Sequence, residues 1–524
     1  INYPAGKSVY LDSSGQLVIG GTAVTATAAE LNYVDGVTSN IQTQIDAINP
    51  SPTLTATASG TLANGDTVIV NSNGTVSAVA GSGSPEAIGT AVVFESANSV
   101  FISGIYDANA QKVVISYKDG GNSNYGTAVV GTVSGTAISF GTPVVFISNA
   151  VTTTEIAYDS NAQKVVIAYS NTTLSYHGYA IVGTVSGTSI SFGTPAVFES
   201  GTCVTVEAVY DASAQKVVIA FKDSGNSQRG TAVVATISGT SISFGSQVVF
   251  NSNGETAPIQ AVYDSNAQKI VIAYSDQGNS SYGTAIVGTV SGTSISFGTA
   301  VVFSSAATTK VSIAYDSNAQ KVVIAYNDGG NSSYGTAIVG TVSGTSISFG
   351  TSAVFSSLAV SYLSMDYDAT AQRTLIISTA PSAYVGAVAI GTVSGTSISF
   401  STPSQFHSDD TRSMSIVYDA NAGKSVIAYQ DGDNSDYGTG VVYQPGTLVT
   451  NLTAENYIGI SNAAYSDSAT ATVQIAGSVD DAQSSLTAGQ QYFVQVNGSL
   501  GLTADNPSVI AGTAVSATKI IVKG

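Results

Sequence analysis

Apolar and polar residues alternate, or fall into short apolar blocks, along most of residues 85–446. Two typical stretches are "KIVIAYSD" at residues 269–276 and "YGTAIVGTVSG" at residues 282–292, which are rich in Val, Ile and Tyr and are separated by Gln, Gly, Asn and Ser. Short β-branched and aromatic runs bounded by turn residues favour antiparallel strands over helices. We therefore predict an all-β fold for this part of the chain.

The strand pattern repeats at a fixed period. Each copy contains four predicted strands, which in the fourth copy read "IQAVYD", "KIVIAYSD", "YGTAIVGTVSG" and "SISFGTAVVF". A four-stranded antiparallel unit of about fifty residues, repeated without helices, is the signature of a β-propeller. We predict a seven-bladed β-propeller over residues 85–446. A Tyr-Asp pair marks each copy, at spacings of 51 to 53 residues, and the tyrosines are Tyr106, Tyr158, Tyr210, Tyr263, Tyr315, Tyr367 and Tyr418.

The two ends of the repeat array complement each other. The last copy stops after its third strand, near "YGTGVVYQPG" at residues 437–446, and a matching fourth strand, "EAIGTAVVFES", precedes the first copy at residues 86–96. A closed ring leaves no exposed sheet edge at its ends, whereas a β-solenoid has no reason to divide one unit between its ends. We predict that the N-terminal strand completes the last blade.

The loops of the copies differ in how much they vary. Turns between strands one and two read "DSNAQK" with little change, and turns between strands three and four read "VSGT" almost every time. The crossovers between blades vary, and they lie on the face opposite these constant turns. We expect the constant face to be structural and the varied face to bind a receptor, although unconstrained loops also drift. Candidate contacts in the crossovers are Glu155, Glu207, Glu255, Tyr362 and Arg412.

The loop between strands two and three repeats an Asp, Asn, aromatic arrangement, as in "SDQGNSSYG" and "NDGGNSSYG". It loosely resembles the Asp-box turn of sialidase-type propellers, in which a carboxylate accepts backbone N–H bonds within its own hairpin. Two interpretations stay open: a self-capping turn, or a site for a sugar or a calcium ion. The candidate residues are Asp119, Asn122, Tyr125, Asp276, Asn279, Tyr282, Asp328, Asn331, Tyr334, Asp431, Asn434 and Tyr437.

Composition narrows the function classes. The chain has 33 acidic and 15 basic residues, a formal charge of -18, which opposes nucleic acid and anionic lipid as partners. Its one cysteine excludes an intrachain disulfide, and no run approaches the roughly 20 apolar residues of a membrane span. The three arginines, Arg229, Arg373 and Arg412, fall at positions that do not converge in a propeller. We predict no enzyme, no catalytic residues, no metal and no cofactor, unless a carboxylate pair among Glu155, Glu207 and Glu255 meets at the central mouth.

The regions outside the repeats predict further domains. Residues 1–21 read as a β-rich shaft segment, residues 51–84 as a hairpin module and residues 447–524 as a C-terminal β domain. The last two are hypothesised to form one module into which the propeller is inserted, because the two ends of a closed ring lie side by side.

Residues 22–50 contain a helical pattern. Thr27 and Glu30 make a capping box, and Gly36 interrupts the helix. Isoleucine at both core positions of a coiled coil favours three or more chains, so we predict a homotrimer. The alternative is a short amphipathic helix packed on its own domain. The proposed trimer contacts are Ile41, Ile45 and Ile48.

The segment "TATAAELNYVDGVTSNIQTQID", within residues 22–48, resembles a segment of tail fibres and other virion appendages of tailed bacteriophages, including phages of cyanobacteria. The closing residues 452–524 are similar to β-rich terminal modules of the same kind of protein. The resemblance implies a trimeric virion appendage, extracellular, joined to other virion structural proteins and meeting the host surface. Taken with the varied face, it favours an adhesin for host attachment that binds a cell-surface glycan or protein. The alternatives are a structural spacer, a carbohydrate-degrading depolymerase and a secreted bacterial surface protein.

Overall fold

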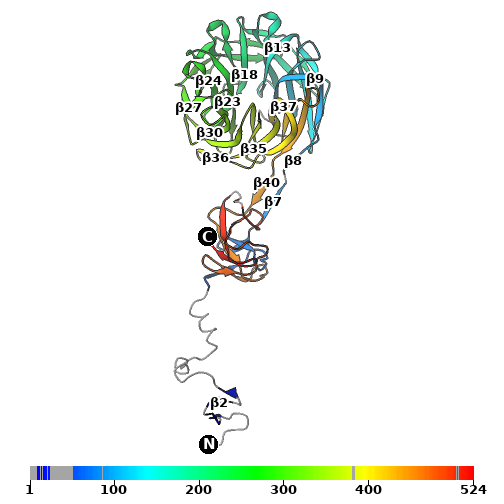
Figure 1. Cartoon of the computed structure of the whole chain (residues 1–524). Coiled ribbons are helices and arrows are strands. Elements are labelled where there is room, and N and C mark those ends of the chain that lie inside the picture. Colours follow the sequence, from blue (N-terminus) through cyan, green and yellow to red (C-terminus); the bar gives the residue numbers. More distant parts are fainter. Residues whose placement is uncertain are drawn as a thin grey trace. The chain divides into compact units, whose positions relative to one another are not determined.

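The computed structural model describes residues 9–11, 13–14, 16–19, 22–23, 51–84, 86–380, 384–502, 504 and 507–523. The chain divides into two compact units (Figure 1), of which the first is Ile1–Gly83 with Leu448–Gly524 and the second is Ser84–Thr447. In the described ranges the ordered elements are strands and three short 3-10 turns, so the predicted all-β fold is confirmed.

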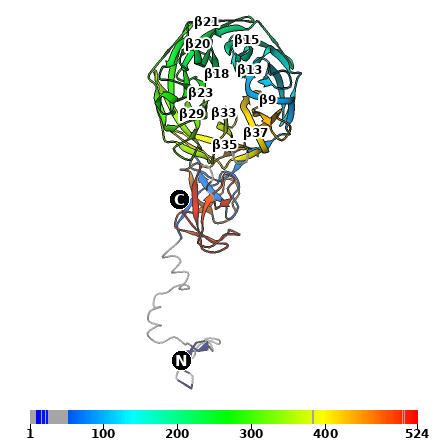
Figure 2. The ribbon, with the colours of Figure 1, turned by 45° about the horizontal axis from the view of Figure 1, so that its top comes forward.

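The larger unit is a β-propeller, in which antiparallel sheets follow one another around a common centre (Figure 2). The innermost strands are β9 (Val92–Asp107), β13 (Val144–Asp159), β18 (Cys203–Asp211), β23 (Thr256–Asp264), β28 (Val311–Asp316), β33 (Tyr362–Asp368) and β37 (Ser404–Asp419). The second strands are β10 (Lys112–Asp119), β14 (Lys164–Asn171), β19 (Lys216–Asp223), β24 (Lys269–Asp276), β29 (Lys321–Asp328), β34 (Arg373–Thr379) and β38 (Lys424–Asp431).

The third strands carry the sheets outward. They are β11 (Tyr125–Ser134), β15 (His177–Ser186), β20 (Arg229–Ser238), β25 (Tyr282–Ser291), β30 (Tyr334–Ser343), β35 (Val385–Ser394) and β39 (Tyr437–Gln444). Three of the loops that precede them contain the 3-10 turns η1 (Thr172–Leu174), η2 (Ser224–Asn226) and η3 (Gln277–Asn279).

The outermost strand is split, which differs from the single strand that the sequence predicts. In one sheet, β21 (Ser241–Phe244) and β22 (Val248–Asn251) both pair with β20, on either side of a break at Gly245. The first pieces of the other sheets are β12 (Ala137–Phe140), β16 (Ser189–Phe192), β26 (Ser294–Phe297), β31 (Ser346–Phe349) and β36 (Ser397–Phe400). The second pieces are the first residues of β13 and β37, together with β17 (Ala196–Glu199), β27 (Val301–Ala307) and β32 (Ala353–Ala359).

The ring closes through the N-terminal strand, in the way that the sequence predicts. β39 pairs antiparallel with β8 (Ala87–Ile88) and with the beginning of β9, in a register that places Tyr443 opposite Ile88 and Thr439 opposite Val93. The last sheet therefore takes its outermost strand from the start of the repeat array.

Side chains packed between successive sheets form the core. One apolar cluster joins Val218 of β19 and Phe250 of β22 to Ile270 and Ile272 of β24. The middle residues of β19 and β24 form continuous apolar runs, because both faces of these strands are covered by neighbouring sheets. This packing holds the innermost strands, and the side chains they carry, in a fixed ring.

The smaller unit contains strands that precede the propeller in the sequence and strands that follow it. One sheet has the order β4 (Thr53–Thr57), β42 (Thr470–Gln474), β41 (Tyr457–Ser461), β5 (Thr67–Val70) and β6 (Val76–Ala78). A second sheet has the order β43 (Val479–Asp480), β47 (Ile520–Val522), β46 (Val509–Ala514), β44 (Gln491–Val494) and β45 (Leu500–Gly501). Ile69 and Val79 share an apolar cluster with Val494 and Ile520, so residues 51–83 and the C-terminal residues have a common core.

Short strands connect or precede these sheets. β7 (Gly81–Ser84) pairs with β40 (Thr447–Thr450), and β1 (Val9–Leu11), β2 (Leu17–Ile19) and β3 (Thr22–Ala23) form a small sheet. The first two residues of the predicted helical segment 22–50 thus belong to β3. Its remaining part up to residue 50, including Ile41, Ile45 and Ile48, lies outside the described residues.

Candidate functional site

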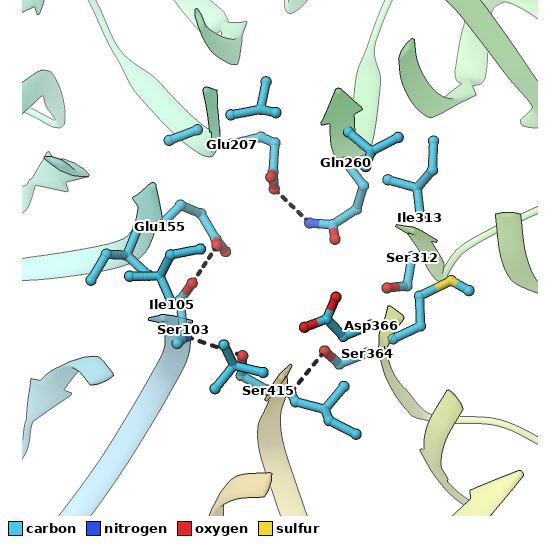
Figure 3. A pocket seen from close by; sticks show the side chains of 18 of the residues that line it. Ser103, Ile105, Glu155, Glu207, Gln260, Ser312, Ile313, Ser364, Asp366 and Ser415 are labelled. Carbon is cyan, nitrogen blue, oxygen red and sulfur yellow. Dashed lines mark hydrogen bonds between the residues drawn. The ribbon is translucent and has the colours of Figure 1, made fainter. Parts of the chain in front are cut away.

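A ring of polar side chains lines the centre of the propeller (Figure 3). Each side chain comes from an innermost strand, three residues before the tyrosine of the Tyr-Asp pair. Together they border a cavity of about 440 Å³, which is called the channel below. The ring consists of Ser103, Glu155, Glu207, Gln260, Ser312, Ser364 and Ser415.

Neighbouring members of this ring are hydrogen-bonded to each other. Ser103 Oγ donates to Glu155 Oε2 at 2.8 Å, and Gln260 Nε2 donates to Glu207 Oε2 at 2.8 Å. Figure 3 shows these two contacts and the Asp366 carboxylate turned toward the same space. Both oxygens of Asp366 accept backbone N–H groups, from Tyr367 and Tyr418, at 2.8 Å each.

The interior of the ring favours protonated carboxyl groups. Burial raises the pKa of Glu155 to about 7. The hydrogen bond from Ser103 lowers this pKa, but its effect is smaller than that of burial. Burial also raises the pKa of Glu207 well above its usual range, and the nearby charge of Glu155 raises it further. Burial raises the pKa of Asp366 to about 6. An uncompensated charge in low-dielectric surroundings is costly, so these groups take up protons more readily than they would in water.

An aromatic hollow of about 490 Å³ lies beside the channel, bordered by β9, β33 and β37. Phe101 and Tyr362 occupy equivalent positions of two repeats, five residues before the tyrosine of the Tyr-Asp pair. Lys118, Met414 and Gln430 also line the hollow. Figure 2 shows β9, β33 and β37 on the same side of the ring.

Phe101 is held in an unusual, exposed position. It is 42% exposed, and its φ of 53° lies in the left-handed region, which a bulky side chain adopts at a cost of about 1–2 kcal/mol. The backbone on both sides is fixed: the Thr154 hydroxyl donates to the Phe101 carbonyl at 2.7 Å, and Ile102 N–H donates to Ser413 Oγ at 3.2 Å. Strain of this kind persists where surrounding contacts determine the conformation.

Two ammonium groups lie over the aromatic rings of the hollow. Lys118 Nζ is 5.7 Å from the centroid of the Phe101 ring, and Lys310 Nζ is 5.9 Å from the centroid of the Tyr362 ring. These distances allow cation–π attraction. The hollow therefore combines apolar ring faces with positive charge.

The predicted Asp, Asn, aromatic residues lie in four loops, each between the second and third strands of its sheet. Asp119 Oδ1 accepts the N–H groups of Gly121 and Asn122, at 2.9 and 3.1 Å. Asp328 accepts Gly330 N–H and Asp431 accepts Asn434 N–H in the same way. The Asp276 carboxylate differs, because it accepts a side-chain bond from Asn251. In three of these loops a backbone bond closes the turn, from Tyr125 N–H to the Asn122 carbonyl, from Tyr334 N–H to the Asn331 carbonyl and from Tyr437 N–H to the Asn434 carbonyl. These three tyrosines and Tyr282 are half-buried. Asn279 is the last residue of η3.

The crossover residues separate into three places. Glu155 and Glu207 both line the channel, but Glu255 does not: it lies eight residues before its tyrosine and pairs with Lys222 at 2.7 Å. Tyr362 lines the hollow. Arg412 forms an ion pair with Asp410 and lies over the Tyr384 ring at 5.5 Å.

Sequence reasoning missed several residues of these two sites, namely Ser103, Gln260, Asp366, Phe101 and Lys118. The signal for the channel was a comparison between copies: the position three before each tyrosine is polar in every repeat. Phe101 carried a weaker signal, since a single aromatic in a varied crossover does not show which way it faces.

Two further classes of site are not found. Among the described residues, no group of three His, Cys, Asp or Glu side chains is arranged to hold a metal ion. None of the helices in the same part of the chain has the length and apolar character that crossing a membrane requires.

No protein-family model and no curated protein matches this sequence. Solved structures with a similar fold include the BP39L lectin from Burkholderia pseudomallei, at 11% identity and a TM-score of 0.48, with 64% of this chain and 94% of that chain covered. The β-propeller domain of Cps50 (Swd1) from Myceliophteria thermophila matches at 8% identity and a TM-score of 0.45, covering 67% and 99%. AofleA from Arthrobotrys oligospora matches at 9% identity and a TM-score of 0.39, covering 64% and 94%. Likenesses at this level assign no function to this chain.

Proposed function

We propose that this protein is a non-enzymatic adhesin that binds a cell-surface glycan in the aromatic hollow of the propeller. The observation that carries the proposal is the pair Phe101 and Tyr362, which border a hollow of about 490 Å³ beside the channel. Many large aromatic side chains of the propeller are buried, whereas Phe101 is 42% exposed. The apolar face of a pyranose ring stacks on such a side chain, and a few polar groups fix its orientation. Ser413 and Gln430 supply polar groups in the hollow.

The fixed backbone of Phe101 favours binding. A ligand that meets a preformed surface loses less ordering free energy than one that must immobilise a loop. The bonds from Thr154 and to Ser413 hold this crossover before any ligand arrives.

The wider assignment is a virion appendage. Each innermost strand with its partners counts as one blade of a seven-bladed propeller, and the resemblance of residues 22–48 and 452–524 to phage tail fibres supports a trimer attached to other virion proteins. A weak glycan site repeated on three chains gains avidity through effective concentration, without any new contact. Host attachment is the role that joins these features.

The test is binding of the purified protein to candidate host cells, before and after enzymatic removal of their surface glycans. Phe101→Ala and Tyr362→Ala should each reduce glycan-dependent binding by tenfold or more, about 1.4 kcal/mol or above. The control is Tyr176→Ala, another exposed aromatic with a positive φ, which lies in the loop between β14 and β15. Equal binding by all variants would show that the hollow is not the binding site. If the protein binds no host that the virus infects, a structural spacer becomes the favoured function.

A second candidate function is a carbohydrate-degrading depolymerase, and the pair Glu155 and Glu207 favours it. Both carboxyl groups have raised pKa values and line the same cavity, and a protonated carboxyl group beside an ionised one can act as acid and base in glycoside cleavage. In this case the purified protein lowers the viscosity of host surface polysaccharide, and Glu155→Gln and Glu207→Gln each abolish that activity. If the protein binds the polysaccharide without changing its viscosity, the depolymerase is ruled out and the adhesin remains the proposed function.

A further inference from the structure

The basic side chains of the propeller are distributed unevenly. Twelve lie in residues 86–447, and seven of these begin the second strand of each repeat, at the constant turns. The remaining five belong to the opposite ends of the sheets, and they are Lys118, Lys222, Arg229, Lys310 and Arg412. Positive charge at the varied face is therefore scarce in a chain of net charge -18.

These five cations differ in their partners. Lys222 pairs with Glu255, Arg412 pairs with Asp410, and Arg229 donates to the Asn226 side chain. For Lys118 and Lys310, the structure gives no carboxylate within 4.0 Å among the described residues. Both of these ammonium groups instead lie over the aromatic rings of the hollow.

An unpaired cation beside an aromatic face fits an anionic sugar. The ring faces of Phe101 and Tyr362 accept the apolar face of a pyranose, while Lys118 and Lys310 supply charge-assisted hydrogen bonds to an acidic substituent. The overall negative charge of the protein repels polyanions at long range. Over distances beyond about 8 Å this repulsion is screened at physiological ionic strength. Binding therefore depends on the two local cations, Lys118, which lines the hollow, and Lys310, which lies over the Tyr362 ring.

We propose that the hollow recognises a carboxylate-bearing sugar, and that Lys118 and Lys310 determine this specificity. The inference rests on the proposed glycan-binding function and narrows its ligand class. Lys118 is half-buried beside Phe101, so its charge is less screened than that of the exposed Lys310. Lys118 therefore contributes the larger share.

The experiment uses surface polysaccharide extracted from cells that bind the full chain, in three forms: native, carboxyl-reduced and desulfated. Carboxyl reduction should weaken binding about tenfold or more, and desulfation should leave it unchanged. Lys118→Gln and Lys310→Gln should weaken binding to the native polymer and cause no further loss on the reduced polymer. Lys112→Gln, at the constant turn, is the matched control and should bind like the unmodified protein.

The outcomes separate the two proposals. Equal binding to the native and reduced polymers, still lost in Phe101→Ala, would overturn the carboxylate specificity and leave glycan binding intact. Dependence on sulfate in place of carboxylate would also overturn it. Binding that survives both Phe101→Ala and Tyr362→Ala would overturn the proposed site itself.

Discussion

At the residue scale, the Tyr-Asp pair that marks each repeat has two separate structural roles. The aspartate caps its own turn: Asp159 Oδ1 accepts the N–H groups of Asn161 and Ala162, at 2.9 and 2.8 Å. The tyrosine reaches the preceding repeat, because Asn161 N–H donates to the Tyr210 hydroxyl at 3.2 Å. The pair therefore joins neighbouring sheets, as it also does between Asn109 and Tyr158 and between Asn266 and Tyr315.

We expect Tyr210→Phe to lower the free energy of unfolding by about 1 kcal/mol, because it removes the bond that joins two repeats. Urea denaturation followed by fluorescence measures this change. Tyr263→Phe is the matched control, since the structure gives the corresponding Ser213 N–H a bond to Asp211 and none to the Tyr263 hydroxyl. An equal loss of unfolding free energy in the two variants would show that the Tyr210 hydroxyl does not stabilise the contact between the two repeats.

Glycine at the break of the outermost strand is also a contact between repeats. An ideal Cβ at Gly245 would lie 1.8 Å from the carbonyl oxygen of Thr293, in the constant turn of the next repeat. Five other glycines meet a threonine carbonyl in the same way: Gly89, Gly141, Gly193, Gly298 and Gly350. In the sixth repeat the equivalent position is Ser401. The seventh repeat, which follows it, reads "QPG" at residues 444–446 in place of the "VSGT" turn.

Gly245→Ala should therefore destabilise the propeller by about 1–3 kcal/mol, because the added methyl group displaces backbone of the neighbouring sheet. Ser401→Ala should change stability by less than about 0.5 kcal/mol, as surface substitutions usually do. Thermal unfolding of both variants is the measurement. A tolerated alanine at residue 245 would show that neighbouring sheets can move apart at this contact.

At the element scale, the innermost strands concentrate acidic groups in one channel, and this makes stability depend on pH. The raised pKa of Glu155, about 7, and the raised pKa of Glu207 mean that the folded chain binds more protons than the unfolded chain above about pH 4.5. Stability consequently falls as pH rises through this window, by about 1.4 kcal/mol per pH unit for each extra proton bound.

Urea midpoints should therefore be higher at pH 5 than at pH 8. Glu155→Gln and Glu207→Gln should each flatten this dependence, because a glutamine side chain has no proton to lose. Glu255→Gln removes a carboxylate outside the channel and should keep the dependence of the unmodified protein. A midpoint that rises with pH would contradict protonated carboxyl groups in the channel.

The same strands show where sequence reasoning succeeds and where it stops. Alternation and turn residues predict the strands and the positions of the turns, because both depend on local chemistry. Register within the innermost strand is less accessible, since β-bulges shift it, as between Val151 and Thr153 of β13. The split of the outermost strand at Gly245 was not predicted either.

At the scale of the whole molecule, ring closure was predictable because the missing strand of the last repeat stands ahead of the first. The channel site was predictable only in part. Glu155 and Glu207 were recognised as carboxylates that meet if their strands line the centre, but the hollow arises from Phe101 and Tyr362, which are separated by most of the ring in sequence and brought together by closure. Sequence proximity cannot indicate such a neighbourhood.

Closure also predicts where the ring opens first. In the internal sheets a short turn connects the outermost strand to the third strand. The strand that pairs with β39 is separated from it in sequence by most of the chain, and only non-covalent contacts hold the two together. Its release therefore gains more loop entropy. Phe94 fixes this strand, with its ring 5.2 Å from the Tyr117 ring, and Phe303 has the same separation from Tyr326 in an internal sheet. Phe94→Ala should therefore increase amide hydrogen exchange in β39 well beyond the increase that Phe303→Ala causes in β25. Equal exchange in the two variants would show that the closing sheet is as firmly held as the internal ones.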